Sequence, residues 1–204
     1  MIRDEHGIIL QQDASDPNNM NLLDGGDSAF STGMMSLWGS EQDTNLLSWF
    51  IVPESFAICR HPNDPKWKDP KLTSRDQVVA WAAGIQSPYR TMVMFHYAES
   101  GKVNSDILSP LVRLYLYEKS GVKAPFWIRT LGKAMLHADL FWNAKIKPDH
   151  EMNQSICIHH HFGTLPLLLK WHPDLIGNMQ DYYCGWRRKP EMFEQFLKFI
   201  ERYK

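Results

Sequence analysis

The 204-residue sequence predicts an all-α protein built on one sizeable helical domain. Apolar side chains recur at helical spacing in one run after another along the chain. These runs begin at capping residues or prolines and end at glycines or prolines, as helices do. Only residues 54–60 suggest a strand, so we expect at most a minor pair of short strands.

The expected helices follow these start and stop signals in order. They cover residues 28–39, 46–51, 74–83, 89–98, 110–119, 125–146, 166–171 and 192–203. The run 91–95 is apolar on every side, which predicts a central, buried helix. Residues 1–21 are polar and rich in turn formers, so we expect an extended arm before a single domain spanning residues 22–204.

The composition indicates which binding partners and which cellular location to expect. A net charge of −1 gives no broad attraction to nucleic acid or to an acidic membrane, so neither is expected as a partner. No secretory signal and no apolar run of membrane-spanning length is visible. Three widely spaced cysteines form no disulfide framework. These features favour the cytoplasm or a virion. The eight tryptophans either fill a helical core or stack on sugar rings.

The stretch from Asp24 to Ser28 is the strongest candidate for a site. Gly25 and Gly26 permit unusual backbone angles and close approach of another group. Asp27 or Ser28 can cap the helix that follows, and acids suit the positive end of the helix dipole. One acid is enough for a cap, so Asp24 and Asp27 together also suggest a functional pair of carboxylates.

A second helix start repeats this arrangement. Thr73 as N-cap with Asp76 at the third helical position resembles a capping box, although glutamate or glutamine is the usual partner. Arg75 can hold a carboxylate or an anionic group in its guanidinium fork, or it is simply solvated. Two acid-bearing helix starts are therefore the main observation from the sequence.

The proline-interrupted loop 61–72 lies between these helix starts and carries His61 and Trp67. Loops with this much side-chain chemistry are often functional, although many are only connections. A metal site has little support, because the three adjacent histidines 159–161 cannot share one helical face. We expect no metal and no cofactor.

The order Asp24-Gly25-Gly26-Asp27-Ser28, Arg60-His61-Pro62 and Ser74-Arg75-Asp76-Gln77 resembles a family of largely uncharacterised proteins of bacteriophages and bacteria. Asn153-Gln154 and Arg187-Arg188 are similar to that family's later landmarks. The resemblance implies helical hairpins arranged as an (α/α) toroid, with the site at one mouth of the ring. Asp24, Asp27, Arg75 and Asp76 map to that mouth. The expected helices are fewer than a complete ring needs, so the toroid is expected to be partial.

Two functions compete on these grounds. One is a carbohydrate-active protein, hydrolase- or lyase-like, in which Asp27 and Asp76 flank the bond and Asp24 tunes Asp27. Trp67 would stack on a glycan or other small polar substrate. Four further residues complete the expected substrate-binding set: His61, Arg75, Asn153 and Gln154. The other function is a non-catalytic structural or interaction protein that associates with virion proteins or with itself.

Overall fold

The protein is mainly helical. The structure is a computed structural model that describes residues 2–12, 23–86, 90–145 and 198. Within these residues it has six α-helices and two short 3-10 helices. They are α1 (Ser28–Leu37), α2 (Glu41–Leu46), η1 (Leu47–Phe50), η2 (Pro70–Leu72), α3 (Arg75–Gly84), α4 (Arg90–Ser100), α5 (Pro110–Ser120) and α6 (Phe126–Lys145). The helices expected at residues 166–171 and 192–203 lie outside the described residues, apart from residue 198.

Short strands are more numerous than the single minor pair that the sequence predicts. β1 (Ile2–Arg3), β2 (Ile9–Gln12) and β3 (Leu23–Asp24) form one antiparallel sheet. Two further hairpins pair β4 (Ile51–Val52) with β5 (Ala57–Ile58) and β6 (Lys102–Val103) with β7 (Asp106–Ile107). Each strand spans only two to four residues. Segments so short are poorly marked by an alternating pattern, which needs about four to eight residues.

Residues 2–12 differ from the extended arm expected for residues 1–21. Residues 2–12 form the β1–β2 hairpin, and Ile8 and Ile9 are buried. The guanidinium of Arg3 donates to both carboxylate oxygens of the buried Asp43 in α2, at 2.9 and 3.0 Å. The hairpin is therefore attached to the helical core by apolar packing and by a paired charge. The proposed division at residue 22 stays a prediction.

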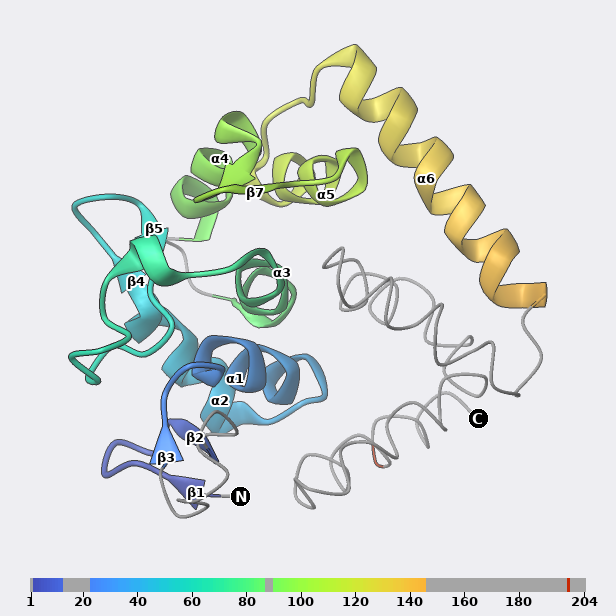
Figure 1. The fold of residues 1–204 in the computed structure, drawn as a ribbon. Coiled ribbons are helices and arrows are strands. Elements are labelled where there is room, and N and C mark those ends of the chain that lie inside the picture. The colour runs from blue at the N-terminus through green and yellow to red at the C-terminus, as the bar shows by residue number, and fades with distance from the viewer. Residues whose placement is uncertain (1, 13–22, 87–89, 146–197, 199–204) are drawn as a thin grey trace.

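Helix α3 is the centre of the described core. Figure 1 shows α3 between α1 on one side and α4 and α5 on the other. A Cβ on Gly33 of α1 would lie 2.5 Å from the backbone of Ala80, so the two helices cross at close range. Trp81 is fully buried and donates from its indole nitrogen to Leu47, at 2.9 Å. Trp38 is also fully buried. These two tryptophans fill the core.

Helix α4 is less central than its apolar run predicts. Val93 and Met94 are buried, but Met92 is 51% exposed and Phe95 is 39% exposed. Consecutive apolar residues at 92–95 necessarily point to every side of a helix, so the run alone does not show which face is covered. α4 packs against α5 through one face and leaves the other open. Among the described helices, none has the length and apolar character needed to cross a membrane.

Candidate functional site

The turn before α1 is closed by its own side chain and by close packing. Asp24 accepts a hydrogen bond from the backbone amide of Gly26 at 2.7 Å, which forms an Asx turn. A Cβ on Gly25 would lie 2.6 Å from the ring of His61, and one on Gly26 would lie 2.9 Å from the Asp24 carboxylate. Neither glycine has a positive φ. Both positions therefore require glycine because neighbouring side chains pack closely against the turn. Unusual backbone angles are not the reason.

Asp27 does not cap α1 with its side chain. It occupies the N-cap position with φ −112° and ψ 16°, and its carboxylate makes no capping hydrogen bond. Ser28 does not cap either, because its hydroxyl donates to the carbonyl of Ile9 in β2 at 2.5 Å. The expectation that one of these two side chains caps the helix is therefore wrong. The half-buried carboxylate of Asp27 is therefore not engaged in capping α1.

One carbonyl joins the two acid-bearing helix starts. The carbonyl oxygen of Gly26 accepts from the guanidinium of Arg60 at 3.0 Å and from the side-chain amide of Gln77. Gln77 is fully buried in the first turn of α3. Asp27 follows Gly26 and Asp76 precedes Gln77 in the chain. The structure therefore brings together the two helix starts that the sequence singles out.

The start of α3 differs in detail from the expected capping box. Ser74, not Thr73, is the N-cap, and its hydroxyl donates to the Asp76 carboxylate at 2.5 Å. The Thr73 hydroxyl instead donates to the carbonyl of Ile58 in β5 at 2.7 Å. Arg75 donates from its guanidinium to the carbonyl of Ile107 in β7 at 3.2 Å. This contact ties Arg75 to the β6–β7 hairpin, and it does not place the guanidinium on the turn at Gly26.

His61 is buried and packs against the turn at Gly25. Its ring is 2% exposed, and Nδ1 accepts from the backbone amides of Asn63 at 3.2 Å and Asp64 at 3.1 Å. In the neutral ring the proton is therefore assigned to Nε2, which lies 3.5 Å from Asp4 Oδ2. Burial lowers the pKa of His61, and the opposing charges of Asp4 and Asp64 only partly offset this effect. A residue so deeply buried positions the turn and does not itself meet a substrate.

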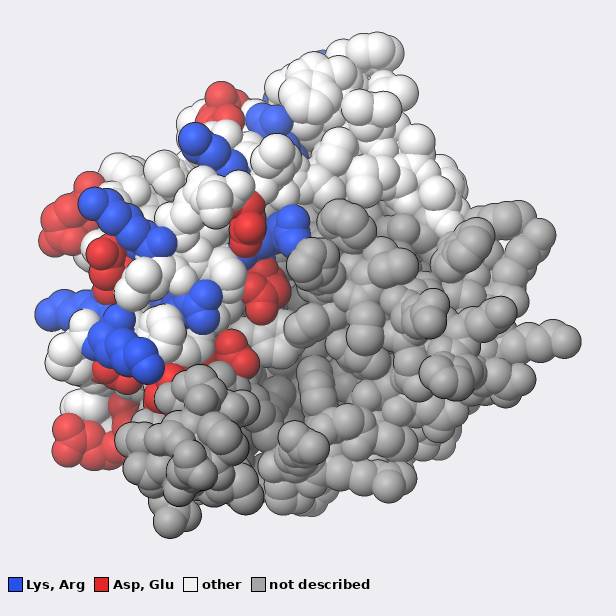
Figure 2. All heavy atoms as spheres, in the orientation of Figure 1, with Lys and Arg blue, Asp and Glu red and all other residues white. Residues whose placement is uncertain are grey.

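Trp67 lies beside Gly26 with charged groups around its ring. Its backbone carbonyl accepts from the amides of Arg60 at 3.2 Å and His61 at 3.3 Å. The Lys66 ammonium is 4.7 Å and the Arg60 guanidinium carbon 5.1 Å from the ring centroid. Lys66 also lies 3.4 Å from Asp24 Oδ2 and is largely exposed. Figure 2 shows acidic and basic side chains interspersed on the face drawn in colour.

The sequence did not assign site roles to several residues that build this arrangement. They are Asp4, Arg60, Lys66 and Gln77. The signal for Gln77 was an amide directly before the apolar run that begins at Val78 and Val79. Asp4 carried no such signal, because it falls in the segment expected to be an arm. Asn153 and Gln154 lie outside the described residues.

Comparison of the chain with protein-family models, curated proteins and solved structures finds no match. Within the described part of the chain, no cluster of three or more His, Cys, Asp and Glu side chains is placed to hold a metal ion.

Proposed function

We propose that the turn 24–28 and the loop 60–67 form a carbohydrate-binding site with hydrolase- or lyase-like chemistry. The observation that carries this proposal is the carboxylate of Asp27, which stands at a helix start without capping it. This carboxylate lies at the positive end of the α1 dipole and is not engaged by the backbone amides of the helix. Asp27 is thus free to serve a ligand as acceptor, base or nucleophile.

The neighbours of Asp27 suit a ligand rich in hydroxyl groups. Trp67 packs against Gly26 and offers a ring on which a sugar can stack once the exposed Lys66 moves aside. Trp67 Nε1 and Gln77 Oε1 have no hydrogen-bond partner among the described residues. One is a donor and the other an acceptor, and both atoms are buried, so a bridging water is the group that would satisfy them.

Asp76 is the proposed second carboxylate. Hydrolysis of a glycosidic bond uses two carboxyl groups about 5–9.5 Å apart, one as acid and one as base or nucleophile. The Gln77–Gly26 hydrogen bond holds the two helix starts together, which supports this pairing. Lys66 partly offsets the charge of Asp24, so Asp24 shapes the turn and has a smaller electrostatic effect on Asp27. The partial (α/α) toroid remains part of this proposal.

Turnover of a panel of soluble polysaccharides, followed by reducing-end release and by unsaturated-product absorbance, tests this function. Asp27→Asn and Asp76→Asn should each lower turnover at least about 100-fold, the size of a lost general acid or base. Asp69→Asn is the matched control, because Asp69 caps η2 and asparagine caps equally well. A wild-type protein that neither binds nor cleaves any glycan, or an Asp27→Asn variant with full activity, would overturn the proposal.

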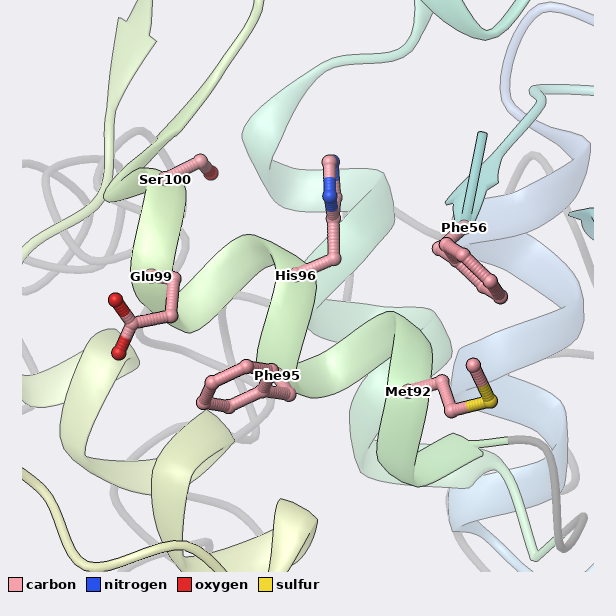
Figure 3. Close-up of a pocket in the computed structure, with 6 residues that line it drawn as sticks. All are labelled: Phe56, Met92, Phe95, His96, Glu99 and Ser100. Atoms are coloured by element: carbon pink, nitrogen blue, oxygen red, sulfur yellow. The ribbon is translucent and has the colours of Figure 1, made fainter. Parts of the chain in front are cut away.

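A non-catalytic interaction protein, such as a virion component, is the second candidate. The observation in its favour is the open apolar face of α4, where Met92 and Phe95 are exposed (Figure 3). A contiguous patch of exposed apolar residues often marks a surface that binds another protein. Light scattering across a concentration series, with and without a candidate partner, would detect such an association. A strictly monomeric protein that turns over a glycan would remove this second function.

A further inference from the structure

His61 attaches the loop 61–69 to the rest of the fold. All nine residues of this loop are described, and His61 is the buried one among them. Its ring packs against the turn before α1, where a Cβ on Gly25 would lie 2.6 Å away. Its Nδ1 also accepts from the backbone amides of Asn63 and Asp64, at 3.2 and 3.1 Å. One side chain therefore contacts the turn and fixes the first bend of the loop.

The position of Trp67 depends on the same bend. The backbone amide of Trp67 donates to the carbonyl of Asp64 at 3.0 Å, and its carbonyl accepts from the amides of Arg60 and His61. Asp64 is thus held by His61 through its amide and by Trp67 through its carbonyl. A Cβ on Gly26 would lie 3.3 Å from the Trp67 ring, so this ring rests on the turn. Loss of the His61 contacts would loosen the segment that carries Trp67.

The contacts of His61 with the loop require a neutral ring. A neutral imidazole has one donor and one acceptor nitrogen, whereas both nitrogens are donors in the protonated ring. A proton on Nδ1 would point at the amide hydrogens of Asn63 and Asp64, so neither amide could keep its hydrogen bond. Backbone amides that lose their acceptor are unfavourable unless water replaces it. The loop can restore these bonds by opening to water.

The other side of the ring favours the protonated form. His61 Nε2 makes no hydrogen bond within the described residues and lies 3.5 Å from Asp4 Oδ2. Asp4 Oδ1 accepts from the backbone amides of His6 and Ile8, at 2.9 and 2.7 Å, so the turn of the β1–β2 hairpin orients this carboxylate. A protonated His61 therefore keeps a partner in Asp4 when it loses the loop amides.

The charges around His61 couple its protonation to opening of the loop. Three ionisable side chains act on the ring, namely Asp4 and His6 from the hairpin and Asp64 from the loop itself. The turn before α1 meets the ring with the uncharged backbone of Gly25. Burial lowers the pKa of His61, and the charges of Asp4 and Asp64 oppose this effect. Opening of the loop removes the burial, so the open form takes up a proton more readily than the closed form.

We infer that His61 is a pH-dependent switch, in which protonation exchanges its hydrogen bonds to the loop for a charge pair with Asp4 and releases the segment 61–67. The β1–β2 hairpin stays attached, because the pair between Arg3 and the buried Asp43 does not involve His61. In acid the ring of Trp67 would leave the turn, which would weaken binding at the proposed carbohydrate site. That consequence rests on the proposed function, whereas the release of the loop does not.

Hydrogen exchange of the backbone amides of Asn63 and Asp64, followed by NMR on the intact chain without ligand, tests the switch. Protection is corrected for the intrinsic pH dependence of exchange. Between pH 7.5 and 5 it should fall at least about fivefold, towards the roughly 30-fold limit for a group with a pKa of about 6.5 in the open form. The amide of Trp81 in α3 should remain better protected at every pH, because the opening is local.

Three variants assign the effect to His61. His61→Asn keeps an acceptor for the two loop amides but takes up no proton, so their protection should stay constant over this pH range. Asp4→Asn removes the partner of the protonated ring and should move the fall in protection to lower pH. His96→Gln, at an exposed histidine of α4, is the matched control and should behave as wild type. Thermal melting at pH 7.5 shows whether each variant is folded.

Three results would overturn the inference. The first is wild-type protection of the loop amides that does not change between pH 7.5 and 5. The second is a loop that exchanges only together with Trp81, which would show unfolding of the whole domain. The third is a fall in protection that His61→Asn, or Asp4→Asn if the first variant does not fold, leaves as in wild type. Because no ligand is present, failure of the carbohydrate proposal would not affect this test.

Discussion

The side-chain amide of Gln77 donates a hydrogen bond to the carbonyl oxygen of Gly26, 51 positions earlier in the chain. Gln77 lies in the first turn of α3, and Gly26 lies in the turn that leads into α1. This contact fixes the relative position of two helix starts that each carry an aspartate. It is the structural basis for treating Asp27 and Asp76 as members of one site.

Replacing Gln77 with alanine should destabilise the protein by about 2 kcal/mol. The change removes a buried hydrogen bond and leaves a small cavity, and each effect contributes in the range of about 1–3 kcal/mol. Arg60 still donates to Gly26, which limits the loss. Urea denaturation measures the effect, with exposed Gln42→Ala in α2 as control. Equal stabilities of the two variants would show that the Gln77 contact does not hold the helix starts.

Asp27→Asn should leave the free energy of unfolding within about 0.5 kcal/mol of wild type. The reason is that the Asp27 side chain makes no capping hydrogen bond. Ser109 does cap α5, accepting from the amide of Val112 at 3.3 Å, so Ser109→Ala should cost about 1 kcal/mol. Thermal melting should show this control as a drop of roughly 2–4 °C. A similar drop in melting temperature for Asp27→Asn would show that the Asp27 side chain does cap α1.

The sequence predicted most described helices because their ends carry chemical signals. Pro110 and Gly121 bound α5, and Gly121 adopts the left-handed conformation that ends a helix. Gly39 follows α1 with φ 97° in the same way. The meeting of the two acid-bearing helix starts was also predictable in outline, because both precede apolar helices that must pack in one core. The contact that joins them was not, since no local rule relates Gln77 to Gly26.

Other features depend on contacts between distant residues. Asp4 lies near His61 only because the β1–β2 hairpin folds back onto the turn before α1. The apolar run of α4 was assigned to the core because the sequence does not show which neighbours cover a helix. The β6–β7 hairpin turns at Asn104, which has φ 52°, but asparagine and glycine in that polar stretch also suit an ordinary loop.

Gly33→Ala should destabilise the protein by about 3 kcal/mol. Alanine has a better helix propensity than glycine by about 1 kcal/mol, so the sequence alone would favour the change. In the structure, however, the new Cβ would lie 2.5 Å from the backbone of Ala80 and force α1 away from α3. Because the clash involves backbone atoms, adding Ala80→Gly should not rescue stability. Rescue in urea denaturation of the double variant would contradict this description of the crossing.

Acid should destabilise the protein through His61. Burial lowers the pKa of His61 in the folded protein, whereas the unfolded chain has the usual value of about 6.5. Below about pH 6.5 the unfolded state therefore binds a proton that the folded state does not. The contribution of His61 to stability is complete above that pH and is lost as the pH falls towards the folded pKa. Urea denaturation at several pH values between 5 and 7.5 would measure this loss.

Two substitutions distinguish the contribution of His61 to acid sensitivity from the contribution of the carboxylates. His61→Asn keeps an acceptor for the amides of Asn63 and Asp64 but cannot take up a proton, so stability should depend less on pH in this window. The charge of Asp4 raises the pKa of His61, so Asp4→Asn should extend the loss of stability to lower pH. If His61→Asn kept the full acid sensitivity of wild type, other groups would be its source.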